Sequence, residues 1–369
     1  MEAGAGNKAI KVCFVSPKAY PLFDGSVEGV FGGAEVDLYM LGTELAADDA
    51  FEISFVVADY GQEKEKTIEG VRIIKSLDFK RCALCGAVAI WRALKRAEAD
   101  VYVIKTASAG VPLVTMFCRL HKRVFVYRTA HKRECDGTYL KEHFILGRLF
   151  KFSLKRADKV FAQNVSDSES LKETMGVESE VVPNGHRLGD AVQGEKDCVL
   201  WVGRSAEFKR PEKFIALARK FAAARFVMIC QRATGDKNYE QLVRKIKIVP
   251  NIEFYEQVGF GEIDALFERA KVFVNTSDAE GFANTFIQAC KAGCAILSLN
   301  VNPDGFLDKY SCGICCGGDE NRMADELKKM LEEDSWQEPG RNGRKYAEEN
   351  HDIRTIVNRY KEVFAECGL

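Results

Sequence analysis

The sequence predicts an α/β protein built from two tandem, doubly wound, Rossmann-like domains, and three observations support this. Strand-like apolar runs alternate with longer helical patterns along the whole chain, which is the rhythm of parallel sheets with crossover helices. A stretch rich in glycine and charge at residues 183–197 interrupts the alternation once and is typical of a linker. The length of 369 residues exceeds what one core usually supports, so we expect a cleft between two domains to hold the site.

The first half of the chain contains the elements of a complete sheet. Helical patterns occupy residues 34–48 and 86–99, among several apolar runs. The expected strands are residues 11–17, 52–59, 71–77, 101–106, 123–130, 159–164 and 179–184. The first sheet is therefore expected to extend to about residue 183.

The second half repeats the pattern with more continuous apolar strands, which are typical of a sheet covered on both faces. The expected strands are residues 198–204, 225–230, 251–257, 271–277, 295–300 and 313–318, and the expected helices are residues 211–224, 238–247, 262–270 and 284–292. Three helical stretches follow, at residues 321–333, 343–350 and 353–366. The last carries Ile356, Tyr360, Val363 and Phe364 at helical spacing, which predicts a packing stripe.

Composition and charge exclude several classes of protein. The hydrophobic fraction of 47% and the charged fraction of 29% are those of an ordinary globular protein. A net charge of -1 argues against nucleic-acid binding through overall charge. The chain has neither a membrane-length apolar run nor an apolar signal core at its start, so a cytoplasmic location is expected. The 13 cysteines, several of them in strand-like runs, are expected to be reduced thiols.

The strongest local motif is VGRSAEFKRPEK at residues 202–213. Arg204 ends a predicted strand, Lys209 follows five residues later, and Pro211 suits the first position of a helix. Ligands of parallel sheets bind at the carboxyl ends of the strands, so the two cations suit an anionic, phosphate-bearing ligand there. The alternative is a pair of solvated surface charges.

A second motif, VFVNTSDAEGFANTFIQACKAG, spans residues 272–293. Gly281 would let a ligand approach the backbone, while Asn284 or Thr285 begins a helix whose free N–H groups favour phosphate. Glu280 would repel phosphate, so binding of neutral hydroxyls suits it better. The alternative is an ordinary acidic residue at a helix start.

A third motif places Gly32 and Gly33 before the first helix, where they would admit a diphosphate or a sugar. Two glycines are weak support by themselves. The chain has no G-x-G-x-x-G after a strand, which argues against a nicotinamide or flavin enzyme.

Taken in order, FGGAE, ADKVFAQN, VVPNG, VGR with its lysine, and EGF resemble the retaining family-4 glycosyltransferases of the GT-B fold. The resemblance covers nearly the whole chain. It implies an acceptor-side domain at residues 1–185, a nucleotide-sugar-binding domain at 196–345, and a C-terminal helix within 346–369 that packs back on the first domain. It also implies a metal-independent hexosyltransferase with a nucleotide diphosphate sugar, UDP- or GDP-linked, as co-substrate and no other cofactor.

Carried over to this chain, the resemblance gives Arg204 and Lys209 the task of neutralising the departing diphosphate, and Glu280 that of holding sugar hydroxyls. A front-face retaining route is implied, in which stabilisation of the leaving group does most of the work. The donor-binding positions would be Gly32, Gly33, Gly203, Gly281, Phe282, Ala283, Asn284, Thr285 and Gln288.

Two of the transferred positions depart from the family pattern or its surroundings. Gln288 stands where the family has the acid that grips the ribose, although an amide can also bond a hydroxyl. His131 follows a first-domain strand, where the family often has a histidine facing the donor sugar, but its neighbours are unusual. The alternative for His131 is a surface imidazole between other charges.

The expected acceptor is a glycan or a lipid-linked sugar in surface polysaccharide or glycolipid synthesis. Two alternatives remain open at this stage. One is a nucleotide-sugar-binding scaffold without turnover, which Gln288 favours. The other is a GT-B sugar-nucleotide epimerase, against which the segment around EGF argues.

Two metal-site patterns are set aside. Cys82 and Cys85 form one C-x-x-C spacing, and Cys312 and Cys315, next to Cys316, form another. These fall in different predicted domains, so a shared zinc ion is not expected. Asp278 and Glu280 mimic an acid pair for a metal, but the GT-B enzymes that the chain resembles need none there.

Two segments, near residues 79–97 and 144–159, mix basic residues with aromatic or aliphatic ones. One interpretation is peripheral contact with an anionic membrane surface, on the inner face of the cell membrane. The other is amphipathic core helices whose lysines and arginines extend to solvent.

Overall fold

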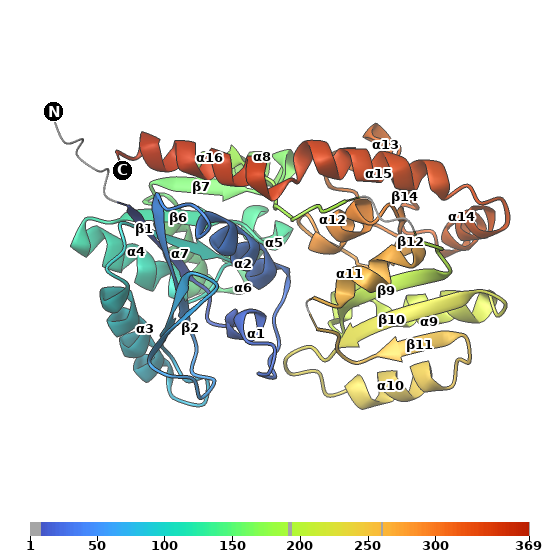
Figure 1. Ribbon diagram of the computed structural model, residues 1–369, viewed down its shortest axis with the longest axis horizontal. Helices are drawn as coiled ribbons and strands as arrows, with labels where there is room; N and C mark the ends of the chain where they lie inside the picture. The colour runs from blue at the N-terminus through green and yellow to red at the C-terminus, as the bar shows by residue number, and fades with distance from the viewer. Residues whose placement is uncertain (1–8, 191–193, 260, 369) are drawn as a thin grey trace. The chain divides into compact units, whose positions relative to one another are not determined.

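The computed structural model describes residues 9–190, 194–259 and 261–368. The chain forms two compact units, shown in Figure 1. Unit 1 comprises Met1–Arg187 together with Ile353–Leu369, and unit 2 comprises Leu188–Asp352. Each unit is a sheet of parallel strands with helices on its faces, apart from one antiparallel pair at the edge of unit 1, so the α/β prediction is confirmed for both.

Within the described residues, the sheet of unit 1 has eight strands in the order β3-β4-β2-β1-β5-β6-β7-β8. All neighbouring strands are parallel except β3 and β4. The strands are β1 Ile10–Val15, β2 Phe51–Val57, β3 Glu65–Ile68, β4 Val71–Lys75, β5 Val101–Lys105, β6 Val124–Arg128, β7 Lys159–Ala162 and β8 Glu180–Val181. The strand order reverses between β1 and β5, where ligands of such sheets usually bind.

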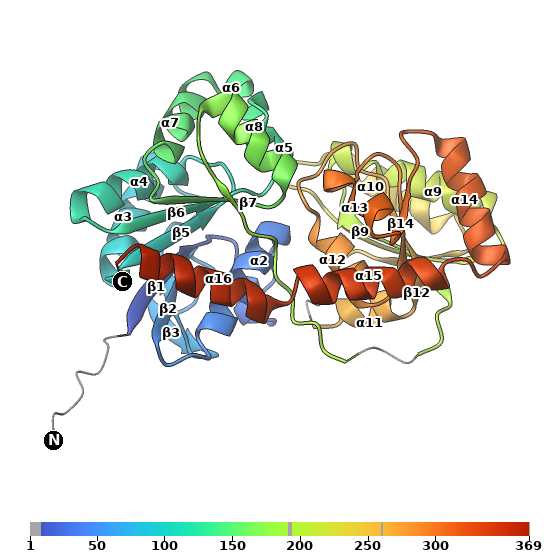
Figure 2. The same ribbon diagram turned by 90° about the horizontal axis from the view of Figure 1, so that it is seen from above.

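Two groups of helices cover this sheet (Figure 2). On one face, α3, α4 and α7 pack in succession and share a core with the central strands. On the other, α2 packs against α16. The helices of unit 1 are α1 Tyr20–Phe23, α2 Gly33–Leu45, α3 Ala83–Ala97, α4 Gly110–His121, α5 Lys132–Cys135, α6 Thr138–Glu142, α7 Phe144–Leu154, α8 Val165–Met175 and α16 Ile353–Glu366.

The described part of unit 2 has a sheet of six strands in the order β11-β10-β9-β12-β13-β14, with all neighbours parallel. Its strands are β9 Cys198–Arg204, β10 Arg225–Gln231, β11 Ile252–Tyr255, β12 Ala270–Asn275, β13 Ala295–Ser298 and β14 Gly313–Cys315. Its α-helices are α9 Pro211–Lys220, α10 Tyr239–Lys247, α11 Ile263–Glu268, α12 Asn284–Lys291, α13 Phe306–Lys309, α14 Glu320–Glu332 and α15 Gln337–Asn350. Short 3₁₀ turns occupy Glu207–Lys209 and Pro303–Gly305.

The C-terminal segment divides between the units at Ile353 rather than at residue 346. Tyr346 lies on α15 and packs its ring against Phe306 and Tyr310 of unit 2. The predicted stripe on α16 is buried in unit 1, with Tyr360 and Phe364 fully enclosed. The ring of Tyr360 meets that of Phe161 edge to face at 4.9 Å. The packing stripe is therefore confirmed.

The segment interpreted as a linker begins as packed structure, which differs from the prediction. Asn184 and His186 are both 2% exposed, and the carbonyl of His186 accepts a hydrogen bond from the Ile353 amide at 3.0 Å. A Cβ on Gly185 would lie 2.5 Å from Cδ1 of Ile353, so a side chain there would clash. Composition missed this because polar residues can be buried when their hydrogen bonds are satisfied. Residues 191–193 of the predicted linker lie outside the described residues.

Across the part of the chain that the structure describes, no helix combines the length and the apolarity that a bilayer span requires. All 13 cysteines lie in that part, and all are free thiols.

Candidate functional site

The sheet of unit 2 brings two predicted motifs together at its own switch point. β9 lies between β10 and β12. After β9 the chain adds strands on the β10 side of the sheet, and after β12 it adds them on the β13 side. β9 ends at Arg204, and α9 begins at Pro211, as predicted. Because the carboxyl ends of parallel strands share one edge, the loops at 205–210 and 276–283 become neighbours.

Lys209 and Glu280 form an ion pair between these two loops. The side chains are 16% and 9% exposed, so the pair is largely shielded from water. The hydroxyl of Ser277 donates a second hydrogen bond to the same Glu280 oxygen at 2.7 Å. Lys209 and Glu280 were predicted as separate ligands for phosphate and sugar, whereas the structure joins them in one pair.

Backbone contacts hold the two loops in register. The amide of Asp278 donates to the Phe208 carbonyl at 2.7 Å, and the hydroxyl of Thr276 donates to the Lys209 carbonyl at 2.7 Å. The indole N–H of Trp201, on β9, donates to that same hydroxyl at 2.9 Å. Thr276 is completely buried, so the backbone of Lys209 is fixed and its side chain starts from a defined position.

Arg204 is half-buried at the end of β9. Its guanidinium forms no hydrogen bond or ion pair with another residue of the described ranges. A Cβ on the preceding Gly203 would lie 2.8 Å from the ring of Trp201, so the indole requires glycine here. A partly buried guanidinium without an internal partner is suited to a carboxylate or phosphate ligand.

The helix after the second loop is α12, with Ala283 as its N-cap. Phe282 is 7% exposed and packs its ring against Phe306 at 4.9 Å, so it serves the core and fixes the loop. Asn284 and Gln288 are 8% and 7% exposed. The side-chain amide of Gln288 forms no hydrogen bond within the described chain. Unlike the Thr106 hydroxyl, this amide is not among the described polar atoms that are fully buried without a partner, so it reaches solvent, where a polar ligand can contact it.

In unit 1, Gly32 caps α2, and Gly33 is its first residue. The Gly32 amide donates to a carboxylate oxygen of Glu35 at 2.7 Å, which is one half of a capping box; the other half needs an N-cap side chain that glycine lacks. An anion at this helix start would therefore compete with the carboxylate of Glu35. A neutral sugar hydroxyl would meet less repulsion there than a diphosphate.

His131 lies just past β6, at the predicted edge of the unit 1 sheet. It is the N-cap of α5, and its Nδ1 accepts a hydrogen bond from the Arg133 amide at 3.1 Å. The imidazole is half-buried. This contact gives His131 a structural task, and it fixes the tautomer because an accepting Nδ1 carries no proton.

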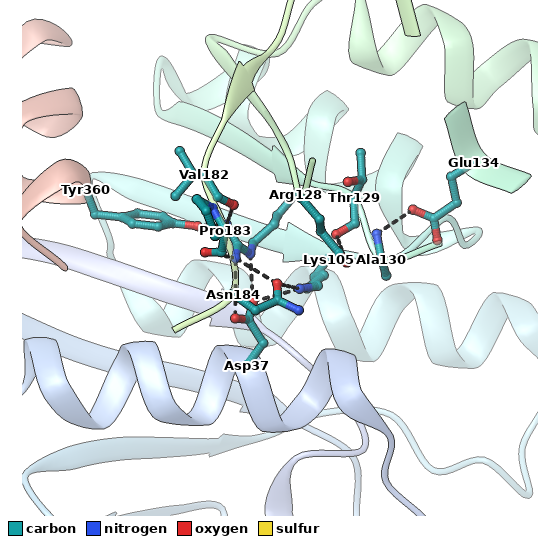
Figure 3. A network of polar contacts seen from close by, with 11 residues as sticks. Asp37, Lys105, Arg128, Thr129, Ala130, Glu134, Val182, Pro183, Asn184 and Tyr360 are labelled. Atoms are coloured by element: carbon teal, nitrogen blue, oxygen red, sulfur yellow. Dashed lines mark hydrogen bonds and ion pairs between the residues drawn. The ribbon is translucent and has the colours of Figure 1, made fainter. Parts of the chain in front are cut away.

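Charged residues that the sequence analysis did not single out converge at this same edge of unit 1 (Figure 3). Arg128, at the end of β6, and Lys105, at the end of β5, both pair with Asp37 on α2. All three side chains are at most 3% exposed. Asn184 accepts from both cations at 2.9 Å. The cluster therefore joins two strands, one helix and the start of the inter-unit segment.

Hydrogen bonds to the surrounding chain complete this cluster. Arg128 also donates to the carbonyls of Val182 and Pro183 and to the Tyr360 hydroxyl, at 3.0, 2.8 and 3.2 Å. Burial would raise the pKa of Asp37, but the charges of Arg128 and Lys105 lower it to about 2. Burial lowers the pKa of Lys105 to about 8, assisted by the charge of Arg128 and opposed by that of Asp37.

Thr106 follows Lys105 directly and has a φ of 79°. A β-branched residue rarely adopts this left-handed conformation. The Thr106 hydroxyl is buried without a partner among the residues that the structure describes. Strain and an unpaired polar group at the ligand edge of a sheet are typical of functional sites.

Among the described residues, no group of three or more His, Cys, Asp or Glu side chains is placed to hold a metal ion. Asp278 instead pairs with Arg210, whose Nε lies 2.7 Å from its carboxylate. Glu280 is engaged by Lys209. The acid pair that mimics a metal site in the sequence is thus neutralised by two cations.

Two protein-family models match the chain, one over each unit. Residues 31–188 match "Glycosyltransferase Family 4", and residues 196–333 match "Glycosyl transferases group 1". The chain belongs to the family-4 glycosyltransferases. It is a glycosyltransferase enzyme of the GT-B fold, and the predicted family and fold are confirmed.

Solved structures agree on the fold of this glycosyltransferase. Sucrose-phosphate synthase from Thermosynechococcus elongatus is 16% identical, with a TM-score of 0.78 and coverage of 96% of this chain and 98% of that one. WaaG, a glycosyltransferase involved in lipopolysaccharide biosynthesis, is 14% identical, with a TM-score of 0.71 and coverage of 95% and 99%. The pneumococcal O-GlcNAc transferase GtfA is 13% identical, with a TM-score of 0.60 and coverage of 84% and 63%. A comparison with curated protein sequences gave no match.

Proposed function

We propose that this glycosyltransferase moves a hexose from a UDP- or GDP-linked donor to a glycan or lipid-linked acceptor, with retention of anomeric configuration. The proposed setting is surface polysaccharide or glycolipid synthesis on the cytoplasmic side of the membrane. The observation that carries the proposal is the charge arrangement at the switch point of unit 2. There, the guanidinium of Arg204, which has no partner among the described residues, lies at the end of β9, and Lys209 follows on the fixed adjoining loop.

Two cations at this edge suit the diphosphate of a nucleotide sugar. The leaving diphosphate gains negative charge as the glycosidic bond breaks, and fixed cations stabilise that charge without reorganisation. In the proposed reaction, Arg204 binds a phosphate oxygen directly, while Lys209 divides its charge between Glu280 and the phosphate. Glu280 then retains oxygen lone pairs for the hydroxyls of the donor sugar, which repel it far less than phosphate does.

Uracil is the first nucleobase to test in the donor, because a similar solved structure contains a uridine nucleotide. The GtfA structure holds UDP and GlcNAc. The side-chain amide of Gln288, on α12, is proposed to bond a ribose hydroxyl, a contact that every nucleotide offers. UDP and GDP are therefore both included in the test.

The reaction is proposed to need no metal ion and no further cofactor. In many nucleotide-sugar reactions a divalent cation neutralises the diphosphate, and Arg204 and Lys209 supply two positive charges for that purpose here. Activity that is unchanged after treatment with EDTA supports this part of the proposal. Activity lost with EDTA and restored by Mg²⁺ or Mn²⁺ contradicts it.

The decisive experiment is titration calorimetry of the purified chain with UDP, GDP and their sugars. We expect one of the two diphosphates to bind, and binding to weaken at least about tenfold in Arg204→Ala, the loss of one charge-assisted contact. The matched control is Arg219→Ala, which removes a solvent-exposed arginine on α9. If neither diphosphate binds the parent protein, the proposed donor class is wrong.

A nucleotide-sugar-binding scaffold without turnover is the second candidate, and Gln288 favours it because an amide gives a weaker ribose contact than a carboxylate. Transfer or donor hydrolysis by the parent protein excludes this candidate. Proton NMR of the first product gives the anomeric configuration, and inversion contradicts the retaining route.

A membrane contact for the lipid-linked acceptor is proposed on α3, α4 and α7 of unit 1. Residues 79–97, 110–123 and 144–157 carry twelve lysines and arginines and no aspartate or glutamate. Large apolar side chains on the same segments are exposed, among them Leu84 at 80%, Ile145 at 71% and Leu120 at 66%. Exposed apolar side chains interspersed with cations on the same helices suit the surface of an anionic bilayer.

The geometry of α7 supports this contact. The guanidinium of Arg148 lies over the ring of Phe144 at 3.9 Å, and that of Arg156 lies over Phe152 at 3.6 Å. Both rings are at least half exposed. The interpretation of this segment as a core helix is supported only for the opposite side of α7, where Phe150 and Leu154 are buried.

A further inference from the structure

Cys82 and Cys85 stand apart from the other cysteines of the chain. Of the 13, nine are buried, Cys315 and Cys367 are partly exposed, and only Cys82 and Cys85 are exposed. Both lie at the start of α3, where Cys82 is the N-cap. They lie in unit 1, far along the chain from the donor motifs of unit 2.

The two thiols face each other. Their sulfur atoms lie 2.8 Å apart, and the Cys82 sulfur also accepts a hydrogen bond from the Cys85 amide at 3.3 Å. Cys82 is thus held at the first turn of the helix, with its partner one turn further along. The two sulfurs are therefore already in contact in the reduced chain.

The surroundings favour a thiolate at Cys82. The contact with the Cys85 thiol, followed by the hydrogen bond from the Cys85 amide, lowers the pKa of Cys82. The same pairing raises the pKa of Cys85. The start of a helix stabilises a negative charge, and Lys80 and Arg81 precede the pair in the sequence. An exposed thiolate beside a second thiol is the arrangement of a reactive dithiol.

We propose that Cys82 and Cys85 form a redox-active dithiol that exchanges with low-molecular-weight disulfides of the glutathione type. The Cys82 thiolate attacks one sulfur of the disulfide, forms a mixed disulfide and releases one thiolate. Cys85 loses its proton to water and attacks the Cys82 sulfur, which releases the second thiolate and closes the Cys82–Cys85 disulfide. Two electrons pass from the protein to the small disulfide, whose two halves leave as thiols.

The test incubates the reduced full-length chain with glutathione disulfide, quenches with acid, alkylates the remaining thiols and measures intact and peptide masses. We expect the parent protein to lose two alkylatable thiols per chain, both at this pair, without retaining a glutathionyl group. In Cys85→Ser, a single glutathionyl group should accumulate on Cys82. In Cys82→Ser, Cys85 should react about tenfold more slowly than Cys82 does in the converse variant.

The matched control is Cys367→Ser, which removes a partly exposed thiol outside the pair and should react as the parent does. Circular dichroism of each variant checks that it folds, and serine at exposed positions is expected to be tolerated. Retention of both thiols by the parent, or equal rates at Cys82 and Cys85 in the two single variants, overturns the proposal. If added Zn²⁺ protects the two thiols from alkylation, and no disulfide forms when Zn²⁺ is absent, the thiols form a metal site. This result overturns the redox proposal as well.

Discussion

Arg128 binds Asp37 through two nitrogen atoms, with Nε at 2.6 Å from Oδ2 and Nη2 at 3.3 Å from Oδ1. The two residues are 91 positions apart in the sequence, and both are buried. The remaining donors of Arg128 bond the segment after β8 and Tyr360 of α16. One side chain therefore ties the sheet, the first long helix and the C-terminal helix of unit 1 together.

Arg128→Ala should lower the free energy of unfolding by about 3 to 5 kcal/mol, because it leaves the Asp37 charge poorly compensated. Urea denaturation followed by circular dichroism measures this change. The matched control is Arg123→Ala, which removes an ion pair with Asp100 whose side chains are 38% and 25% exposed and should cost at most about 1 kcal/mol. Equal losses of unfolding free energy in the two variants would show that the buried ion pair stabilises the fold no more than the exposed one does.

Lys105 predicts a pH dependence of stability in the alkaline range. Its pKa falls from 10.5 to about 8 on folding, so between these pH values the unfolded chain holds a proton that the folded chain has released. The contribution of Lys105 to the free energy of unfolding therefore rises with pH across this window. Below pH 8 both states are protonated, and the penalty of the buried charge is fully present.

Lys105→Met should lack this rise. The stability of the parent relative to the variant is expected to increase by about 2 kcal/mol between pH 7.5 and pH 9.5, as measured by urea denaturation at both pH values. The control is Lys95→Met on α3, an exposed lysine that is solvated in both states and should give the same difference at the two pH values. If the parent and Lys105→Met differ in stability by the same amount at both pH values, Lys105 is still charged at the higher pH in the folded chain, and the prediction is wrong.

The Lys209–Glu280 pair predicts opposite effects on binding and on transfer. Glu280→Gln should strengthen UDP or GDP binding a few-fold, because Lys209 is then free to pair with phosphate. The same variant should lower sugar transfer by about 100-fold or more, since a charge-assisted contact to the sugar is lost. Lys209→Ala should weaken both. Calorimetry and a transfer assay separate these effects.

The matched control for Lys209→Ala is Lys213→Ala. Lys213 lies on the adjoining helix, α9, and pairs with Glu320 at 3.2 Å. This control variant should leave diphosphate binding within a factor of about two. Weaker diphosphate binding in Glu280→Gln would mean that the pair acts as one preformed unit and not as two competing ligands.

Gln288→Glu restores the acid of the family pattern and should tighten nucleoside diphosphate binding several-fold, about 1 kcal/mol, if the residue meets the ribose. The comparison of UDP with 2′,3′-dideoxy-UDP isolates this contact, because only the parent nucleotide offers the hydroxyls. If Gln288→Glu prefers UDP over the dideoxy nucleotide no more than the parent protein does, the ribose does not contact residue 288.

The proposed membrane surface predicts sedimentation with anionic vesicles and not with zwitterionic ones. A variant with Phe144, Ile145 and Phe152 changed to serine should lose most of this binding, and high salt should weaken it in the parent. The control variant changes Val165 and Ile248 to serine, which are exposed apolar residues outside α3, α4 and α7. No binding of the parent at low salt contradicts the membrane contact.

Local signals explain what could be predicted from the sequence. The end of β9 at Arg204 and the start of α9 at Pro211 follow from an apolar run and from a proline at a helix start. The edge strand Glu65–Ile68 was missed because it is short and mostly polar. Helix α4 was missed as well, and its valines and Pro112 near the start obscure a helical signal.

The side-chain partners could not be predicted, because they depend on strand order. Arg128 and Lys105 looked like ordinary ends of apolar strands, and Asp37 like a polar position on a helix. Only the reversal of order between β1 and β5 brings them together. The sheet edge was a usable signal all the same: cations at the ends of two successive strands are unusual and could have prompted a search for a buried acid.

The return of α16 to unit 1 has a consequence for synthesis on the ribosome. Residues 188–352, which form all of unit 2, are made before Tyr360 and Phe364 exist, yet these two rings fill the core of unit 1. Chains grow from the N-terminus, and domains generally fold as they emerge. The unit that is started first is therefore completed only after unit 2 has been made, and its core stays incomplete until α16 has emerged.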